Sequence, residues 1–233
     1  MAELIVALDY PEPKSALEMV HRLRDVTEWF KVGLELYTAA GPSIVESVRN
    51  LGGNVFLDLK FMDIPNTVKG AVRSGTNIGA QIMTLHLLGG QDMIQAGLEG
   101  RDQAVGNTLL FGVTLLTSMD IRDLPCPLGS NTTDLIVTLA EGGVRWGMDG
   151  VVCSGLEVGR IRRFCPRDFL CLTPGIRRTN GSDDQKRIVT PEEAVRGGAD
   201  FLVVGRPITG ADDPEAEAVA FAEAIRSASP ALT

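Results

Sequence analysis

The segment from residue 55 to residue 67 reads Val55-Phe56-Leu57-Asp58-Leu59-Lys60-Phe61-Met62-Asp63-Ile64-Pro65-Asn66-Thr67. Its first three residues are apolar and follow Gly52-Gly53-Asn54, a pattern that predicts a buried strand. Because side chains alternate along a strand, Asp58 and Lys60 are expected to point to one face at its C-terminal end. Pro65 suits the first turn of a helix that begins after Asp63. The segment therefore predicts a strand, a charged strand end and a helix, in that order.

The three charges at the end of this strand can be interpreted in two ways. Removing charged groups from water costs free energy, so a protein rarely places them beside an apolar strand without a use. Each charge also has a structural explanation. Asp63 could be the N-cap of the following helix, and Asp58 and Lys60 could form a surface ion pair that adds little stability. The rest of the chain decides between these interpretations.

The same alternation of an apolar strand and a helical segment extends through the whole chain. Besides the strand that opens at Val55, strands are predicted at residues 4–9, 30–34, 82–86, 108–117, 150–154, 169–176 and 201–205. Helices are predicted at residues 11–26, 41–51, 68–78, 92–103, 133–146, 156–164, 191–197 and 214–227. Most of the strands are continuously apolar, which is typical of parallel strands that are covered on both faces.

Eight such units in 233 residues predict one α/β domain over residues 1–233, a (β/α)₈ TIM barrel. A doubly wound open sheet is the alternative. It is disfavoured because Asp9-Tyr10-Pro11 follows the first strand, where a G-x-G-x-x-G phosphate loop would be expected.

Composition excludes several classes of function. The chain has 22 Lys and Arg against 30 Asp and Glu, a net charge of −8, and no basic run, so a nucleic-acid-binding surface is not expected. No stretch approaches the roughly 20 apolar residues of a membrane span, and the chain begins with a strand and shows no signal peptide. The four cysteines form no C-x-x-C pair, which indicates free thiols in a reducing compartment. We therefore expect a cytoplasmic protein.

In a barrel of this kind the active site lies where the C-terminal ends of the strands meet. The residues predicted at those ends are Asp9, Lys31, Asp58, Lys60, His86, Thr117, Ser154, Gly175 and Gly205. A rim of charges solvated by loops would account for each of them singly. Two lysines and two aspartates at one face favour a functional site. The acidic residues lack the spacing of known metal motifs, and no second histidine stands near His86, so no metal is expected.

The last third of the chain predicts an anion site. The segments Thr173–Arg177 and Val204–Ile208 follow the seventh and eighth strands, and barrels often bind a phosphate with these two loops. Gly205 would let the backbone approach the anion, and Arg206 would donate hydrogen bonds to it. The polar loop at residues 177–190 is long enough to be a lid over the site, although a surface loop without function is the alternative.

Seven segments, in order along the chain, resemble those of the orotidine 5′-monophosphate decarboxylase family. They are Val6-Ala7-Leu8-Asp9, Lys31-Val32-Gly33, the segment from Asp58 to Thr67, Leu116-Thr117-Ser118, Thr173-Pro174-Gly175-Ile176-Arg177, Asp184-Gln185 and Val204-Gly205-Arg206-Pro207-Ile208. The pattern D-x-K-x-x-D-I-P-N-T is the most specific of them. The resemblance covers essentially the whole chain.

This resemblance implies a cofactor-free decarboxylation of orotidine 5′-monophosphate to uridine 5′-monophosphate (UMP), the last step of de novo pyrimidine synthesis. Lys60 would be the proton donor, within a charge network that also contains Lys31, Asp58 and Asp63. The resemblance further implies a homodimer in which Asp63 and Thr67 reach the partner's site. The implied substrate-binding residues are Asp9 and Lys31 for the ribose, Thr117 for the pyrimidine, Gln185, Gly205 and Arg206 for the phosphate, and in addition Ile64, Thr67, Pro174 and Arg177.

Two other functions remain open from the sequence. A Mg²⁺-dependent sugar-phosphate decarboxylase or aldolase of the same superfamily, similar to 3-keto-gulonate-phosphate decarboxylase, would share D-x-K-x-x-D. The continuation Ile64-Pro65-Asn66-Thr67 and the presence of Gln185 argue against it. A non-catalytic barrel that binds nucleotides is the other alternative, and the four intact charges of the network argue against it.

Overall fold

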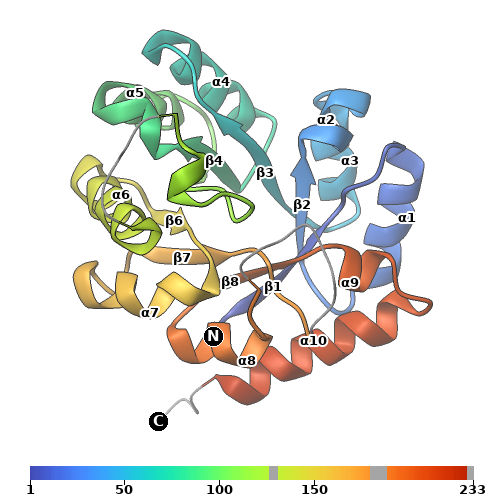
Figure 1. Cartoon of the computed structure of the whole chain (residues 1–233). Helices are drawn as coiled ribbons and strands as arrows, with labels where there is room; N and C mark the ends of the chain where they lie inside the picture. The colour runs from blue at the N-terminus through green and yellow to red at the C-terminus, as the bar shows by residue number, and fades with distance from the viewer. Residues whose placement is uncertain (126–130, 179–187, 230–233) are drawn as a thin grey trace.

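The computed structural model describes residues 1–125, 131–178 and 188–229. Within these ranges eight parallel strands close into a barrel in chain order, and β1 pairs with β8 to complete the ring. The strands are β1 (Glu3–Ala7), β2 (Trp29–Gly33), β3 (Asn54–Phe61), β4 (Ile82–His86), β5 (Leu109–Val113), β6 (Gly150–Val152), β7 (Leu170–Thr173) and β8 (Phe201–Val204). Figure 1 shows this ring of strands at the centre, with the helices around it. The predicted single-domain (β/α)₈ barrel is confirmed.

Helices follow the strands and cover the outside of the barrel (Figure 1). The α-helices are α1 (Pro13–Leu23), α2 (Leu34–Ala40), α3 (Ser43–Asn50), α4 (Pro65–Asn77), α5 (Gly90–Asp102), α6 (Thr132–Trp146), α7 (Gly155–Phe164), α8 (Pro191–Gly197), α9 (Arg206–Thr209) and α10 (Pro214–Ala228). Two short 3₁₀ turns, η1 (Leu87–Gly89) and η2 (Ile121–Asp123), precede α5 and α6. No helix in the described part of the chain is long and apolar enough to cross a membrane. A cytoplasmic location stays a prediction.

Some boundaries differ from those predicted. The strand predicted at residues 108–117 ends at Val113. Val113 pairs with His86 on β4 and with Val152 on β6, and these are the last residues of those strands. Residues after Val113 therefore have no neighbouring strand to pair with. The strand predicted at residues 169–176 stops before Pro174, which has no N–H to donate to the ladder. The sequence pattern also missed α2, a seven-residue helix with one buried residue, Leu36, and hence no apolar stripe to detect.

Alternation along the strands divides the core into two layers. The layer inside the barrel consists of Ile5, Ala7, Phe56, Ile82, Phe111, Leu172, Phe201 and Val203. The ring of Phe201 makes edge-to-face contacts with Trp29 and Phe111, at centroid distances of 5.4 and 6.0 Å. Asp9 follows Ile5 and Ala7 at intervals of two positions, and Asp58 follows Phe56 at the same interval. Strand alternation therefore directs these aspartates to the same side as the inner layer. The inner layer therefore leads directly to the charged strand ends.

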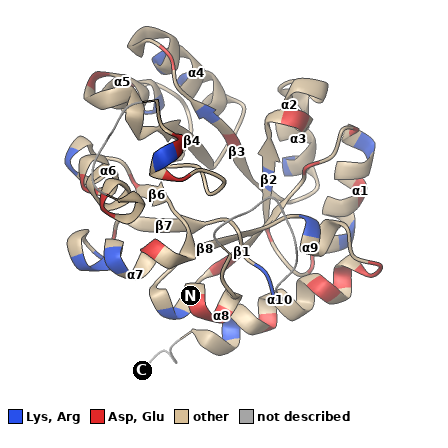
Figure 2. Cartoon of the chain, viewed as in Figure 1, with Lys and Arg blue, Asp and Glu red and all other residues tan. Residues whose placement is uncertain are grey.

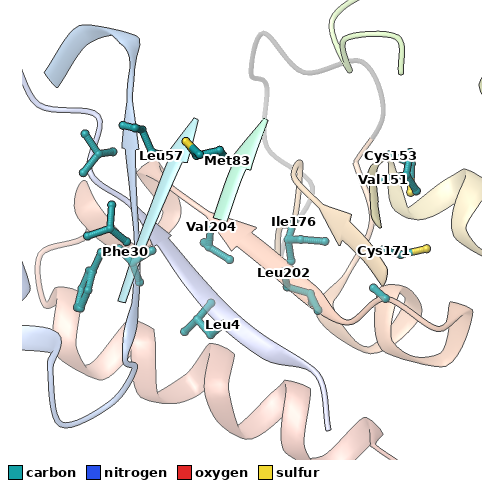
Figure 3. Close-up of a cluster of buried hydrophobic side chains, with 14 of the residues drawn as sticks. Leu4, Phe30, Leu57, Met83, Val151, Cys153, Cys171, Ile176, Leu202 and Val204 are labelled. Carbon is teal, nitrogen blue, oxygen red and sulfur yellow. The ribbon is translucent and has the colours of Figure 1, made fainter. Parts of the chain in front are cut away.

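The second layer lies between the strands and the helices. It includes Leu4 and Val204 from neighbouring strands, with Phe30, Leu57 and Met83 nearby on the next strands round the ring (Figure 3). Burying a side chain of this size contributes about 1.5–3 kcal/mol. Cys153, Cys165 and Cys171 are also buried here as free thiols, as predicted, while Cys126 lies outside the described residues. The two layers fix the strands and thus the positions of the residues at their ends.

Candidate active site

The C-terminal ends of the strands surround a cavity of about 250 Å³. Among its lining residues are ten that the sequence predicted: Asp9, Lys31, Asp58, Lys60, Thr117, Pro174, Gly175, Arg177, Gly205 and Arg206. They come from the ends of β1, β2, β3, β7 and β8 and from the loop after β5. The structure thus brings together the charged strand ends and the predicted anion-binding loops.

An unbroken chain of opposite charges crosses one side of this cavity. Nζ of Lys31 lies 2.8 Å from Oδ1 of Asp9 and 4.0 Å from Oδ2 of Asp58. Nζ of Lys60 lies 2.7 Å from the same Oδ2 of Asp58. Lys31 is the one charged residue of β2, and Asp58 and Lys60 are the two charged residues of β3, so the charge colours on these strands in Figure 2 belong to them. The side chains of Asp58 and Lys31 are only 11% and 12% exposed, so their interaction is weakly screened by water.

The remaining oxygen of Asp58 is also satisfied. The hydroxyl of Thr84, on β4, donates a hydrogen bond of 2.9 Å to Oδ1 of Asp58. A buried carboxylate is tolerated only when both oxygens find partners, and here the partners are two ammonium groups and a hydroxyl. The surface ion pair considered for Asp58 and Lys60 is therefore the wrong interpretation, because Asp58 is buried.

The backbone at Lys60 has a left-handed conformation, with φ of 50°. Of the residues that the structure describes, it is the one non-glycine residue with positive φ, a conformation that costs on the order of 1–3 kcal/mol. The pairing of β3 with β4 changes register between Leu57 and Phe61, so a bulge interrupts regular alternation here. Asp58 and Lys60 share a face as predicted, but the bulge, and not plain alternation, determines the direction of the lysine.

The residues that follow β3 do not reach the cavity of their own chain. Asp63, Ile64 and Thr67 are exposed and are not part of the lining. Oδ1 of Asp63 accepts a hydrogen bond of 2.6 Å from the N–H of Ile64. The N-cap of α4 is Ile64, without a side-chain cap, so the interpretation of Asp63 as an N-cap is wrong. Within the described ranges of this chain Asp63 forms no ion pair.

Arg177 and Arg206 lie on the side of the cavity formed by β7 and β8, beside Gly175 and Gly205. Gly175 has φ of 80°, a conformation that favours glycine. The N–H of Arg177 donates to the carbonyl of Val189, and the N–H of Val189 donates to the carbonyl of Gly175. These bonds hold the two ends of the predicted lid together. Gln185 and the other residues from 179 to 187 lie outside the described residues.

Two residues at strand ends do not line the cavity. The hydroxyl of Ser154 accepts a hydrogen bond from the N–H of Leu156 and caps α7. His86 is half-buried, and its Nδ1 has no hydrogen-bond partner among the described residues. Burial lowers the pKa of His86, the ammonium of Lys60 lowers it further, and the carboxylate of Asp58 opposes the shift. This histidine therefore favours its neutral form beside the charged network.

Comparison with known proteins identifies the family. The model of the family described as "Orotidine 5′-phosphate decarboxylase / HUMPS family" matches residues 2–221. The chain belongs to this family. A protein of Maridesulfovibrio salexigens named orotidine 5′-phosphate decarboxylase is 54% identical over 217 residues, which cover 92% of this chain and 94% of that protein. A protein of the same name from Nitratidesulfovibrio vulgaris strain DP4 is 52% identical over 224 residues, covering 94% and 95%.

A solved structure supports the same assignment. The crystal structure of orotidine 5′-phosphate decarboxylase from Lactobacillus acidophilus superposes with a TM-score of 0.83 at 33% identity, over 97% of this chain and 99% of that one. The resemblance to this decarboxylase family that the motifs indicated is confirmed.

The sequence did not predict the apolar residues that line the cavity. The other lining residues of the cavity are Ala7, Phe56, Val113, Leu115, Leu116, Val152, Cys153, Leu172 and Val203. Ala7, Phe56 and Val203 each stand two positions before a predicted site residue, so strand alternation was a signal that could have found them. In the described part of the chain, no group of three His, Cys, Asp or Glu side chains could hold a metal ion.

Proposed function

We propose that this protein decarboxylates orotidine 5′-monophosphate to UMP and CO₂ without a metal or organic cofactor, as the last step of de novo pyrimidine synthesis. The observation that carries the proposal is the position of Asp58, which holds the ammonium groups of Lys60 and Lys31 at one cavity. Arg177 and Arg206 line the same cavity, after β7 and β8. Relatives at 54% and 52% identity have the name of this enzyme.

The lining of the cavity supports one orientation of the substrate. Its phosphate would lie at Arg206, Arg177 and the N–H of Gly205, since guanidinium groups form strong charge-assisted bonds with phosphate. Asp9 and Lys31 would bind the ribose hydroxyls. The pyrimidine would then lie over the apolar lining, with further contacts to Thr117 and Pro174 and, from a second chain, to Ile64 and Thr67.

In this orientation the carboxylate-bearing C6 faces Lys60. The bond between C6 and the carboxylate breaks, CO₂ leaves, and the electron pair stays on C6. The ammonium of Lys60 stabilises this charge and then transfers a proton to C6, which forms UMP and leaves a neutral amine. The amine regains a proton from water before the next turnover. Asp58 keeps the ammonium directed at C6 through the contact of 2.7 Å.

One ammonium cannot account for the whole rate enhancement. At about 4 Å from the carbanion it contributes roughly 4 kcal/mol at an effective dielectric constant of about 20. Enzymes commonly lower the barrier by about 8–23 kcal/mol. We infer that binding of the distant phosphate supplies part of the difference by closing the loop at residues 177–190 as a lid. The paired ends of that loop, at Gly175, Arg177 and Val189, support this role.

We further propose that the active unit is a homodimer with shared sites. The network in one chain contains Asp9, Lys31, Asp58 and Lys60, whereas Asp63 is exposed and lies outside it. Met62 and Ile64, which flank Asp63, are exposed apolar side chains, 56% and 68% accessible. A second copy packed on this rim would cover them and would bring Asp63 and Thr67 into the neighbouring cavity.

An absorbance assay for the loss of orotidine 5′-monophosphate tests the proposal. We expect the wild-type protein to turn the substrate over equally with and without EDTA. Lys60→Ala should abolish turnover while UMP still binds, because the change removes an interaction made chiefly in the transition state. Residual activity within about tenfold of wild type would exclude Lys60 as the proton donor. UMP binding without any turnover by the wild type would indicate a binding protein, and loss of activity in EDTA a metal-dependent relative.

A further inference from the structure

One hydroxyl group links two members of the charge network, Asp58 and Lys60. Thr84, the third residue of β4, is fully buried (0% exposed). Its Oγ1 donates a hydrogen bond of 2.9 Å to Oδ1 of Asp58. The same Oγ1 accepts a hydrogen bond of 3.0 Å from the backbone N–H of Lys60. Thr84 does not line the cavity itself.

The bulge in β3 explains why this hydroxyl is needed. In a regular parallel pair, strand N–H groups donate to carbonyl groups of the neighbouring strand. The register of β3 and β4 shifts between Leu57 and Phe61, and the N–H of Lys60 donates to the side chain of Thr84 instead. Without that acceptor, a backbone donor would be left unpaired in the same residue that has the left-handed φ of 50°.

The second hydrogen bond fixes the carboxylate. Oδ2 of Asp58 lies 2.7 Å from Nζ of Lys60 and 4.0 Å from Nζ of Lys31. Rotation of the carboxyl group would change both distances at once. The hydroxyl of Thr84 on Oδ1 opposes this rotation. Thr84 thus fixes both the backbone of Lys60 and the carboxylate of Asp58, which binds the ammonium group of Lys60.

We propose that Thr84 is a positioning residue for the decarboxylation, which acts by fixing the Lys60 backbone and the Asp58 carboxylate in one geometry. The inference rests on the proposed function, in which Lys60 transfers a proton to C6. Thr84 touches neither the cavity nor the phosphate-binding arginines. Its loss should therefore affect the chemical step and leave the affinity for UMP unchanged.

Thr84→Val tests this inference because it removes the hydroxyl and keeps a β-branched side chain. We expect kcat to fall by about 10- to 100-fold, since a displacement of about 1 Å at a reacting group costs about that much. The dissociation constant of UMP, measured by calorimetry, should stay at the wild-type value. Thr84→Ser, which keeps the hydroxyl, should retain most of the wild-type kcat.

Thr27 provides a matched control at the other end of the barrel. It is also buried, its Oγ1 donates to the carbonyl of Leu4 at 2.6 Å, and it accepts from the N–H of Trp29 at 3.2 Å. Thr27→Val should therefore lose a similar pair of hydrogen bonds and some stability, with no change in kcat. A role of Thr84 in stability alone would make the two valine variants alike.

The possible outcomes separate this inference from the proposed function. If Thr84→Val turns over like wild type while Lys60→Ala is inactive, the positioning role is wrong and the proposed function stands. An equal loss of kcat in Thr84→Val and Thr27→Val would also overturn it. Should Thr84→Val fail to fold, Thr84→Ser decides, because a serine variant as inactive as Lys60→Ala contradicts a role for the hydroxyl. A wild type without activity would overturn the proposed function, and this inference with it.

Discussion

The ammonium nitrogen of Lys60 lies 2.7 Å from Oδ2 of Asp58, two positions earlier on the same strand, and the lysine reaches it from a left-handed backbone. A non-glycine residue keeps such a conformation only where its surroundings compensate for the strain. Here the compensation comes from a charge-assisted hydrogen bond to Asp58 and a backbone hydrogen bond to Thr84. The strain therefore coincides with the group to which the chemical step is assigned.

Arg206→Ala tests the proposed phosphate site. The variant removes a charge-assisted contact worth about 1.5–3 kcal/mol, so kcat/KM for orotidine 5′-monophosphate should fall by roughly 10- to 150-fold, chiefly through KM. On orotidine, which lacks the phosphate, wild type and variant should perform alike. Arg160→Ala is the control, because Arg160 lies on α7, does not line the cavity and pairs with Asp134 at 2.9 Å. An equal loss on both substrates would place Arg206 elsewhere.

Gly33→Ala tests the role of Lys31 without altering a charged residue. A Cβ at Gly33 would lie 2.8 Å from Nζ of Lys31 and 3.2 Å from Oδ1 of Asp9, so the ammonium group must move. The backbone at Gly33 is extended (φ −96°, ψ −175°), which alanine adopts without strain. We expect normal stability and a kcat/KM reduced by about tenfold or more, because the ammonium group of Lys31 would move away from Asp9 and Asp58.

The control for this prediction is Gly159→Ala. Gly159 is exposed on α7, and a methyl group at its Cα would have nothing within 4 Å, so activity should not change. Stability should rise slightly, since alanine is favoured over glycine in a helix by up to about 1 kcal/mol. Full activity in Gly33→Ala would show that the exact position of the Lys31 ammonium is unimportant.

The pH dependence of stability should report the burial of His86. Burial, assisted by Lys60, lowers the pKa of His86 below its ordinary value of 6.5. The unfolded chain therefore binds a proton at this residue more readily than the folded one, and the free energy of unfolding falls as the pH falls below about 6.5. His86→Gln should weaken that fall in urea unfolding experiments between about pH 7.5 and pH 5.5. The exposed His21 provides a control variant, His21→Gln. An unchanged slope in His86→Gln would contradict the assignment.

The sequence predicts the barrel because its signals are local and repeated. Each strand is an apolar run, and parallel strands of a closed barrel end at the same face, so Asp9, Lys31 and Asp58 could be grouped without coordinates. Strand alternation also contains the signal for Phe56 and Ala7, which line the cavity two positions before Asp58 and Asp9.

The missed features depend on relationships between strands. The bulge at Lys60 arises from the register of β3 against β4, which no pattern within β3 reveals. Thr84 lies inside an apolar run, and its role depends on two hydrogen bonds to the neighbouring strand β3, one with an oxygen of Asp58 and one with the N–H of Lys60. Likewise, the exposed position of Asp63 follows from where α4 begins, at Pro65, and cannot be read from the spacing of charges.

Subunit mixing tests whether Asp63 serves a second chain. If it does, Lys60→Ala and Asp63→Asn homodimers are each impaired at both sites. In a mixed dimer one site contains both substitutions, and the other combines an intact Lys60 with an intact Asp63 from the partner. Random exchange produces about half mixed dimers, each with one good site, so activity should recover to roughly a quarter of wild type.

The control for this experiment comes from the pair that the structure places in one chain. Asp58 and Lys60 are 2.7 Å apart within a single subunit, so mixing Asp58→Asn with Lys60→Ala leaves every site with one defect and should restore nothing. Subunit exchange is first demonstrated with differently tagged chains. If exchange occurs and the mixture of Lys60→Ala with Asp63→Asn gives no more than the sum of its parents, Asp63 acts in its own chain and the sites are not shared. Recovery in that mixture but not in the control would require Asp63 to cross the interface, because no arrangement within one chain could then supply both an intact lysine and an intact carboxylate.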